Sequence, residues 1–528
     1  MLSLLIKNGK IVDGCGNPWF YGDIGIRGDK IVQVKPQISD PADRIIDASG
    51  LIVSPGFIDT HTHSDLLVFK HPDEDSKLLQ GITTSLIGQD GLSVAPLDEV
   101  NKPYMMLRVS GLLGTYLEKW PWNSIAEFLS ALEKLPPATN TMMLVPHGAI
   151  RATVVGWENR PANCEELEKM KQILSQAMEE GACGFSTGLI YPPGMYADRI
   201  ELVELCRVTA RYGGIFVVHM RNEGDGVLDS ISEVIEICEE AECPLHISHL
   251  KIAGRRNWGK ATQVLSFLEE AHDKGLDLTF DQYPYVAGST MLDAVIPPRF
   301  HSGGTAKLLE RLKQPALREE IRKIQENIIL ESWDNWVDLI GWNNIVVSAV
   351  KTDKNRFAEG KSIAEIAKIT QKTPIDVVAD LIISEENAVT MVLFYGCEDD
   401  IKEIMRSELM MLCTDGIVGG KPHPRVYGTC ARFLGKYVRE EKVISLPQAI
   451  RKMTSFPAQR LGLQDRGVIR EGQVADLVIF DFDTIIDKGT YTEPNRYPVG
   501  IEYVIINGKI AVDKGKLTSV RSGKVLRG

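Results

Sequence analysis

The sequence has no run of apolar residues long enough to span a membrane. Its apolar start, residues 1–6, is too short for a secretory signal and has no basic segment before it. The nine cysteines are scattered and form no C-x-x-C pair, so we expect most of them to be buried apolar side chains in a reducing compartment. These absences predict a cytoplasmic protein without a membrane partner.

The sequence also lacks an excess of positive charge. Its 59 lysines and arginines are outnumbered by 71 aspartates and glutamates, which gives a formal net charge of -12 at pH 7. An acidic balance argues against binding to nucleic acid or to anionic membranes. An anionic substrate would therefore have to be captured by a local basic cluster. At 528 residues the chain is long enough for a large barrel plus a second module.

Short β-prone runs separated by turns occupy both ends of the chain. Within residues 1–54, Asn-Gly and Gly-Asp steps mark hairpin turns between the runs. Residues 475–481 and 501–509 have the same texture. Because the N-terminal unit has too little apolar surface to stand alone, we expect residues 1–54 and 464–528 to pair into one small β-sandwich.

Between the two ends, β-like runs alternate with amphipathic helical patterns. One such pattern spans residues 164–180, where Leu167, Met170, Leu174 and Met178 recur at helical spacing. The predicted strands are residues 56–63, 83–88, 142–146, 183–187, 214–219, 244–249, 277–282 and 409–414. Eight β/α units predict an α/β fold with a TIM-type (β/α)8 barrel over residues 55–463.

The connection between the seventh and eighth predicted strands is far longer than a barrel needs. Residues 285–342 contain Pro297-Pro298, Gly303-Gly304 and a charged helical stretch. We interpret them as an insertion that covers the mouth of the barrel, where lids often help to define substrate size.

Histidine and aspartate side chains stand where predicted strands end. His61 and His63 close the first strand, and their i, i+2 spacing puts both imidazoles on one face of an extended chain. His219, His249 and Asp415 end three further strands. Neutral imidazole suits zinc, and catalytic groups of such barrels come from the strand ends. The alternative of ordinary hydrogen-bonded histidines does not account for so many strand ends, so we predict a metal site.

An ordered set of motifs carries a resemblance to a known family. The motifs are GFIDTHTH (56–63), GFSTGLIYPPG (184–194), HMRNE (219–223), ISHLK (247–251), NWGK (257–260), DQYPY (281–285) with GST (288–290), and TDG (414–416) followed by HPR (423–425). Over nearly its whole length the chain resembles the amidohydrolase superfamily and, within it, the N-acyl-D-amino-acid deacylases, or D-aminoacylases.

One position departs from that family. The D-aminoacylases carry a metal-binding cysteine in a Gly-Asn-Cys-Gly setting after the second strand, and here Asp90 takes that position in GQDG (88–91). A carboxylate can bind or bridge divalent metals but is a harder ligand than thiolate, so it can admit other ions. No lysine lies in residues 183–188, so the carboxylated lysine bridge of other amidohydrolases is not evident.

The resemblance implies one or two bound zinc ions, with another divalent metal as an alternative. The implied ligands fall into two sets, which are Asp90, His219 and His249 for the tighter ion, and His61, His63 and Asp415 for a second position. A bound metal lowers the pKa of water toward about 7. Asp415 would act as the base that takes the proton of that water and returns it to the leaving amine.

The substrate implied by this family carries an α-carboxylate, which calls for a cation. Lys251 shares strand-face parity with His249 and would project over the same site. The resemblance adds four substrate-binding residues, which are Tyr191, Tyr283, Ser289 and Arg425. Arg221 and Glu223 are expected to form an ion pair that orients His219.

The resulting expectation is an enzyme that hydrolyses the amide bond of N-acyl-D-amino acids to a carboxylate and a free D-amino acid. The partner would be this small molecule, and assembly into a homo-oligomer stays open. A cyclic-amide hydrolase of the dihydropyrimidinase or dihydroorotase type is the nearest alternative. A non-catalytic amidohydrolase-like scaffold is a third, although such a protein would be expected to have lost ligands that are present here.

Overall fold

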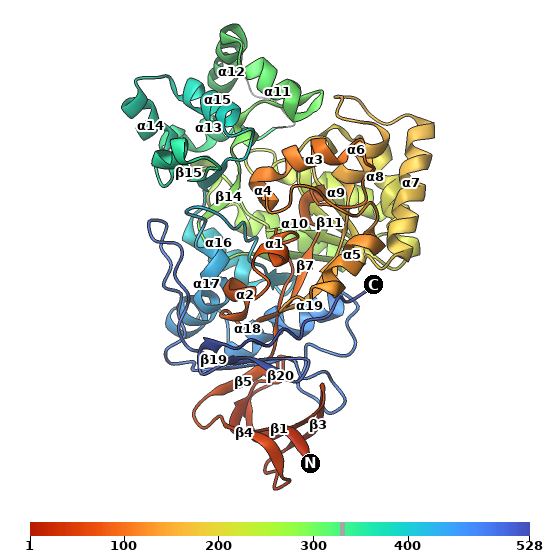
Figure 1. Ribbon diagram of the computed structural model, residues 1–528, viewed down its shortest axis with the longest axis vertical. Helices are drawn as coiled ribbons and strands as arrows, with labels where there is room; N and C mark the ends of the chain where they lie inside the picture. Colours follow the sequence, from red (N-terminus) through yellow and green to blue (C-terminus); the bar gives the residue numbers. More distant parts are fainter. Residues whose placement is uncertain (328–332) are drawn as a thin grey trace.

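The computed structural model describes residues 1–327 and 333–528. Three parts follow one another along its longest axis (Figure 1). A sheet built from strands near both ends of the chain lies at one end, helices of the region between residues 304 and 384 lie at the other, and a layered α/β part lies between them. No helix in the described part of the chain is long and apolar enough to cross a membrane.

The terminal sheet combines strands from both ends of the chain. Its nine strands are β1 (Leu2–Ile11), β2 (Phe20–Arg27), β3 (Lys30–Lys35), β4 (Ala42–Asp47), β5 (Ile52–Pro55), β18 (Leu477–Phe480), β19 (Ile501–Ile506), β20 (Lys509–Asp513) and β21 (Lys516–Leu517). The antiparallel pairing of β5 with β18 joins the two ends, with Val53 opposite Ile479. Both side chains are fully buried in the same apolar cluster, so packing and pairing act together.

The central part consists of parallel strands separated by helices. One sheet contains β6 (Phe57–Asp59), β7 (Ile82–Ile87) and β8 (Asn140–Met143), and a six-stranded sheet contains β9 (Val145–Pro146), β10 (Gly184–Gly188), β11 (Ile215–His219), β12 (Leu245–Ile247), β13 (Leu278–Gln282) and β17 (Met410–Leu412). The strands are buried on both faces, and β11 (IFVVH) accordingly reads as a nearly continuous apolar run, whereas β7 (ITTSLI) also buries threonine and serine side chains. Parallel strands with intervening helices place the chain in the α/β class, as predicted.

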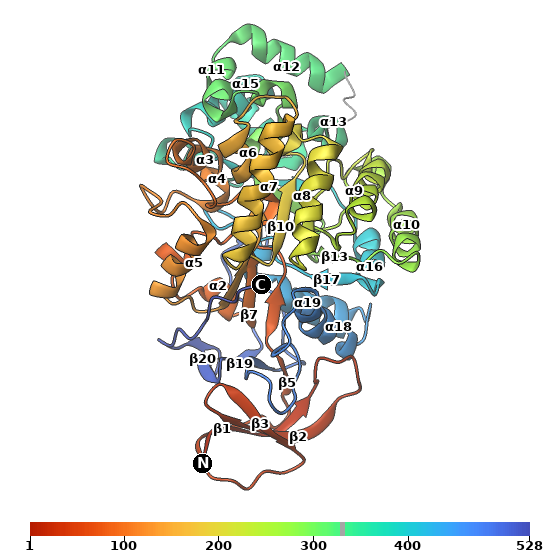
Figure 2. The same ribbon diagram turned by 90° about the vertical axis from the view of Figure 1, so that its right-hand side faces the viewer.

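The intervening helices cover the outer face of these strands. They are α1 (Leu67–Lys70), α2 (Asp75–Leu78), α3 (Lys102–Arg108), α4 (Ser110–Leu113), α5 (Ile125–Lys134), α6 (His147–Val154), α7 (Cys164–Glu179), α8 (Arg199–Arg211), α9 (Val227–Ala241), α10 (Ala261–Asp273), α16 (Glu398–Arg406), α17 (Arg425–Arg432), α18 (Leu446–Met453) and α19 (Ser455–Arg460). Figure 2 shows α7 and α8 alongside β10. The predicted helix at 164–180 is observed as α7, where Asn163 caps the first turn.

Each of the eight predicted strands overlaps an observed strand, with two differences. The third is divided into β8 and β9. The first ends at Asp59, so His61 and His63 lie in the chain that follows β6. There the backbone pairs with the segment after β17: Asp415 N donates to His61 O (2.7 Å) and His63 N donates to Gly416 O (3.1 Å). These bonds bring the first and last parallel strands together.

A separate layer is inserted between β13 and β17. It contains an antiparallel sheet in the order β14-β16-β15 and five helices, which are β14 (Ala287–Met291), β15 (Ile345–Ala349), β16 (Thr390–Phe394), α11 (Gly304–Leu312), α12 (Pro315–Asn327), α13 (Trp336–Ile340), α14 (Ile363–Thr370) and α15 (Pro374–Ser384). The layer has its own apolar cluster. The layer extends past residue 342, where the predicted insertion ended, because β16 lies further along the chain and is the middle strand of its sheet. Residues 328–332, within the insertion predicted at 285–342, lie outside the described residues.

Candidate metal centre

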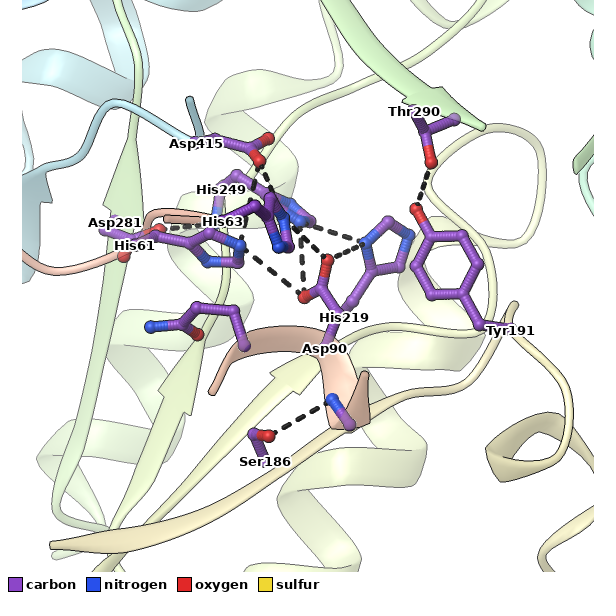
Figure 3. A network of polar contacts seen from close by, with 12 residues as sticks. His61, His63, Asp90, Ser186, Tyr191, His219, His249, Asp281, Thr290 and Asp415 are labelled. Carbon is purple, nitrogen blue, oxygen red and sulfur yellow. Dashed lines mark hydrogen bonds and ion pairs between the residues drawn. The ribbon is translucent and has the colours of Figure 1, made fainter. Parts of the chain in front are cut away.

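Four imidazoles and two carboxylates converge at the ends of the parallel strands. Figure 3 shows their nitrogen and oxygen atoms turned toward one another. The six residues are His61 and His63 after β6, Asp90 after β7, His219 at the end of β11, His249 after β12, and Asp415 after β17. All six are buried. The structure therefore brings together every residue that the sequence analysis assigned to metal binding.

Asp90 lies at the centre of the cluster. Its Oδ1 is 3.6 Å from His61 Nε2 and 3.8 Å from His249 Nε2. Its Oδ2 is 3.5 Å from His63 Nε2 and 3.8 Å from His219 Nδ1. Burial alone would raise the pKa of Asp90, but the histidines around it outweigh burial and hold that pKa well below its ordinary value. Each carboxylate oxygen thus faces one imidazole from each of the two predicted ligand sets.

The loop after β7 positions Asp90. Gly88 approaches the backbone of the neighbouring chain so closely that a Cβ there would lie 2.4 Å from the Leu144 carbonyl oxygen. Gly88 N donates to Asp65 Oδ1 (3.1 Å), and Ser186 accepts a hydrogen bond from Gly91 N (3.1 Å). The glycines in GQDG are therefore required for this turn, because a larger residue would displace it.

Three cluster residues have a left-handed backbone conformation. The φ angles are 56° for Asp90, 36° for His249 and 49° for Asp415. Residues other than glycine adopt this region rarely, at a cost of about 1–3 kcal/mol each, and they gather at functional sites. Three residues of the cluster thus have a backbone conformation that costs free energy, and their side chains point toward the same place.

Asp415 makes different contacts with its two oxygens. Oδ2 pairs with Arg425 Nη1 at 2.9 Å, and Oδ1 lies 3.2 Å from His63 Nε2 and 3.7 Å from His61 Nε2. Burial would raise the pKa of Asp415, but the positive charge of Arg425 and the nearby histidines hold it far below the ordinary range. Asp415 is therefore an ionised carboxylate with one fixed oxygen and one that faces the cluster.

Glu223 is an additional member of the cluster, although the sequence analysis predicted that it would pair with Arg221. Its Oε1 lies 3.3 Å from His249 Nδ1, its Oε2 lies 3.6 Å from His219 Nε2, and it forms an ion pair with Lys251. The predicted pair between Glu223 and Arg221 is wrong. Arg221 instead pairs with Glu233 of α9 (Nη2 to Oε1, 2.9 Å), since its side chain turns toward that helix.

A layer of hydrogen bonds beneath the cluster fixes the strand ends. Asp281, quoted above only within a motif, accepts from Thr60 Oγ1 (2.7 Å), from His246 Nε2 (3.0 Å) and from the backbone of His249. Such contacts around metal-binding histidines orient the rings. No sequence pattern showed this role, because Asp281 lies 32 to 221 residues away in the chain from its three partners.

The donor atoms of the cluster fit a divalent metal. Buried polar atoms normally have hydrogen-bond partners. Here His61 Nδ1, His61 Nε2, His63 Nδ1, Asp90 Oδ1 and His219 Nε2 are buried and have none. Three sets of donors lie within 4.8 Å of one another, namely His61, His63 and Asp415; His61, Asp90 and His249; and His219, Glu223 and His249. Imidazole nitrogens with carboxylate oxygens are a typical zinc donor set.

A cavity of about 30 Å³ opens beside the cluster. Four of the five predicted substrate-binding residues line it, which are Tyr191, Lys251, Tyr283 and Ser289. Arg425 does not line it, because its side chain is fully buried behind Asp415 and donates to the Ser289 carbonyl oxygen (3.0 Å). Trp336, Leu393 and Tyr395 of the inserted layer also line the cavity. They carried no signal in the sequence, since apolar residues in a helix or strand read as core.

Comparison with known proteins gives full-length matches. The amidohydrolase family matches residues 44–512 of this chain. A D-aminoacylase of Alcaligenes xylosoxydans xylosoxydans is 33% identical over 527 residues, which cover 99% of this chain and 97% of that protein. An N-acyl-D-glutamate deacylase of the same organism is 34% identical, with coverage of 100% and 96%. The crystal structure of the N-acyl-D-glutamate deacylase of Bordetella bronchiseptica, complexed with zinc and a phosphonate inhibitor, matches with a TM-score of 0.84 and 31% identity over 100% of both chains.

Proposed function

This chain belongs to the amidohydrolase family, and we propose that it hydrolyses the amide bond of N-acyl-D-amino acids to a carboxylate and a free D-amino acid. The observation that carries the proposal is the buried cluster of four histidines with Asp90 and Asp415, in which five buried donor atoms of His61, His63, Asp90 and His219 have no hydrogen-bond partner. It occurs in a chain whose whole length aligns with deacylases of this substrate class.

The two predicted ligand sets would hold the metal. His219 and His249 with Asp90 form one set, and His61 and His63 with Asp415 form the other. Zinc is the metal of the related Bordetella bronchiseptica enzyme and suits these donors, and one or two ions can be accommodated. A bound divalent metal supplies an activated water at neutral pH and polarises the amide carbonyl.

Asp415 moves the proton. Because Arg425 fixes Oδ2, the free oxygen Oδ1 is the atom that accepts the proton of the attacking water. The low pKa of Asp415 keeps this oxygen ionised before the reaction. The same oxygen then delivers the proton to the leaving amine.

Lys251 binds the α-carboxylate of the substrate. It lines the cavity, its Nζ lies 2.7 Å from His249 Nδ1, and its charge is paired with Glu223. Tyr283 and Ser289 stand on the same wall of the cavity. Arg425 supports this site from behind, where its guanidinium lies over the Tyr283 ring at 4.5 Å.

The cavity must widen when substrate binds. Its volume of about 30 Å³ is far below the roughly 300–1,000 Å³ of ordinary ligand pockets. Trp336, Leu393 and Tyr395 belong to the inserted layer, and we propose that this layer covers the site and that these side chains move to admit substrate.

The proposal also includes the closure of the barrel and the arrangement of the two chain ends. The bridge between Thr62 and Gly416 supports closure of the parallel strands into a (β/α)8 barrel over residues 55–463, with the site at the carboxyl ends of its strands. Residues 1–54 and 464–528 would form the β-sandwich. The cytoplasmic location and the lack of nucleic-acid and membrane partners stay predictions from the sequence, and assembly into a homo-oligomer stays open.

Two alternatives are less well supported. A cyclic-amide hydrolase would not account for the full-length matches to deacylases of N-acylated amino acids. A non-catalytic scaffold would not need six buried ligand residues, three of them in a strained backbone conformation.

The test compares a linear and a cyclic amide. Zinc-loaded protein is incubated with N-acetyl-D-leucine or with dihydrouracil, and the released amine or opened ring is quantified by chromatography. The proposal predicts amine release from the linear substrate. Turnover of dihydrouracil alone would contradict it and support the cyclic-amide alternative.

A further inference from the structure

We infer that the D-amino acid released by this protein has a neutral, apolar side chain and not an acidic one. The inference rests on the proposed deacylase function and specifies its substrate. Overall similarity cannot decide this, because the chain is nearly equally similar to the D-aminoacylase and to the enzyme named for D-glutamate. The residues that line the cavity can decide between an apolar and an acidic substrate side chain.

The cavity offers a single positive side chain. Among the described residues that line it, Lys251 is the one cation, and the α-carboxylate of any substrate requires it. The acidic residues that line the same cavity are Asp90, Glu223 and Asp415. With Lys251 taken by the α-carboxylate, and the proposed metal taken by its ligands and the amide, a second carboxylate on the substrate side chain would have no cationic side chain as a partner, which is strongly unfavourable in a buried site.

Arginines near the cavity are already engaged. Arg425 is paired with Asp415 and buried behind it. Arg108 lies 6.0 Å from the centre of the Tyr191 ring, but it forms a buried ion pair with Asp293 and does not line the cavity. Neither guanidinium lines the cavity, whereas Lys251, although it is also paired with Glu223, does.

The hydroxyl groups of the cavity wall are bonded to one another. Tyr191 Oη and Thr290 Oγ1 lie 2.6 Å apart, and Tyr283 Oη is bonded to Tyr395 Oη. Gly288 permits the second pair, because a Cβ there would lie 2.7 Å from Tyr283 Oη. Each pair uses one hydroxyl proton and leaves one O–H donor, so these groups can bond a neutral polar side chain but supply no positive charge for a carboxylate.

The rest of the wall is apolar. Ile190 and Ile417 come from the strand-end loops, and Trp336 and Leu393 come from the inserted layer. The Trp336 ring packs near that of Tyr395, with centroids 6.1 Å apart. An apolar substrate side chain would gain by burial against these groups, whereas a carboxylate would lose its hydration for no new partner.

Three substrates of similar shape test the inference. N-acetyl-D-leucine, N-acetyl-D-asparagine and N-acetyl-D-aspartate have side chains of nearly equal size that are apolar, polar and charged. We expect kcat/KM to fall in this order, with leucine at least about 100-fold above aspartate, since a buried unpaired charge is rejected more strongly than a change in size. N-acetyl-D-glutamate is included so that a longer acidic side chain is also sampled.

A variant places a cation in the apolar wall. Leu393→Arg should raise the aspartate-to-leucine or glutamate-to-leucine ratio of kcat/KM at least about tenfold, because it gives the second carboxylate a partner. Leu393→Met, which keeps the wall neutral and similar in volume, should leave these ratios within about threefold of the wild type.

The outcomes separate this inference from the function on which it rests. Preference for the leucine substrate, reversed or reduced in Leu393→Arg, supports it. Turnover of the aspartate or glutamate substrate that equals or exceeds turnover of the leucine substrate overturns it and leaves the deacylase function intact. No turnover of any D-substrate by metal-loaded protein overturns the deacylase proposal and this inference with it.

Discussion

Arg425 Nη1 and Asp415 Oδ2 form a buried ion pair at 2.9 Å beside the histidine cluster. The pair leaves Asp415 Oδ1 facing His61 and His63. One oxygen is thus held by the guanidinium, while the other is available for a proton. Because its two oxygens have these different contacts, Asp415 is the acidic residue of the cluster to which we assign the proton transfer.

Replacing Asp415 with asparagine should abolish most activity. The amide would keep the size of the side chain but could not accept a proton, so we expect kcat of Asp415→Asn to fall by about 10²–10⁴-fold. Steady-state kinetics of metal-loaded protein measures this. The control is Asp483→Asn at an exposed position far from the cluster. Activity of Asp415→Asn close to that of the wild type would show that another group moves the proton.

The ion pair also predicts how stability depends on pH. Burial raises the pKa of Asp415, but Arg425 and the histidines lower it far more, so the folded-state pKa lies below that of the unfolded chain. A carboxylate of this kind stabilises the fold above its unfolded pKa of about 3.9 and loses that contribution as the pH falls.

Metal-free wild type should therefore be more stable than Asp415→Asn at neutral pH, and the difference should shrink as the pH falls from about 5 to about 2. Urea unfolding at several pH values measures it. A difference in unfolding free energy that does not change over this range would mean that Asp415 has no lowered pKa in the folded protein.

Asp90 should control metal content. Asp90 is the carboxylate of the ligand set with His219 and His249, and its two oxygens also face His61 and His63. Asp90→Ala should therefore lower the affinity for zinc at least about tenfold. Elemental analysis after dialysis, with Asp483→Ala as control, reports the metal per chain.

Asp90→Cys should keep metal while changing the ion preferred, since thiolate is a softer ligand than carboxylate. Competition between zinc and manganese measures this. An unchanged metal content in Asp90→Ala would exclude Asp90 as a ligand.

Lys251 should determine substrate affinity. Lys251→Met keeps the length of the side chain but removes the charge opposite the α-carboxylate, so KM should rise at least about tenfold. Lys274→Met, at an exposed position that caps the C-terminal end of α10, is the matched control. An unchanged KM in Lys251→Met would move the carboxylate site elsewhere in the cavity.

The parallel strands could be read from the sequence because they recur as short β-prone runs between amphipathic helical patterns, and some of them, such as β11 (IFVVH), are almost wholly apolar. The strands of the inserted layer could not be predicted from the sequence. β14 and β16 are paired through Ser289 opposite Val392, about a hundred residues apart, and no local pattern encodes such a partner.

The same distinction applies to the site. His219 ends β11 and His249 lies two residues past the end of β12, and both were found because strand ends of an α/β fold meet at one edge. The sequence analysis paired Glu223 with Arg221, which is only two residues away in the chain. The actual partner of Glu223 is Lys251, and the two residues come together only in the folded protein. Trp336 was missed for a related reason, since it reaches the cavity from an inserted helix.

The most direct test of the account is amine release from N-acetyl-D-leucine and N-acetyl-L-leucine by the same zinc-loaded protein, with zinc per chain determined in parallel. The account predicts release from the D-enantiomer, little or none from the L-enantiomer, and loss of release in Asp415→Asn. Equal release from both enantiomers, or none from either while zinc is bound, would contradict it.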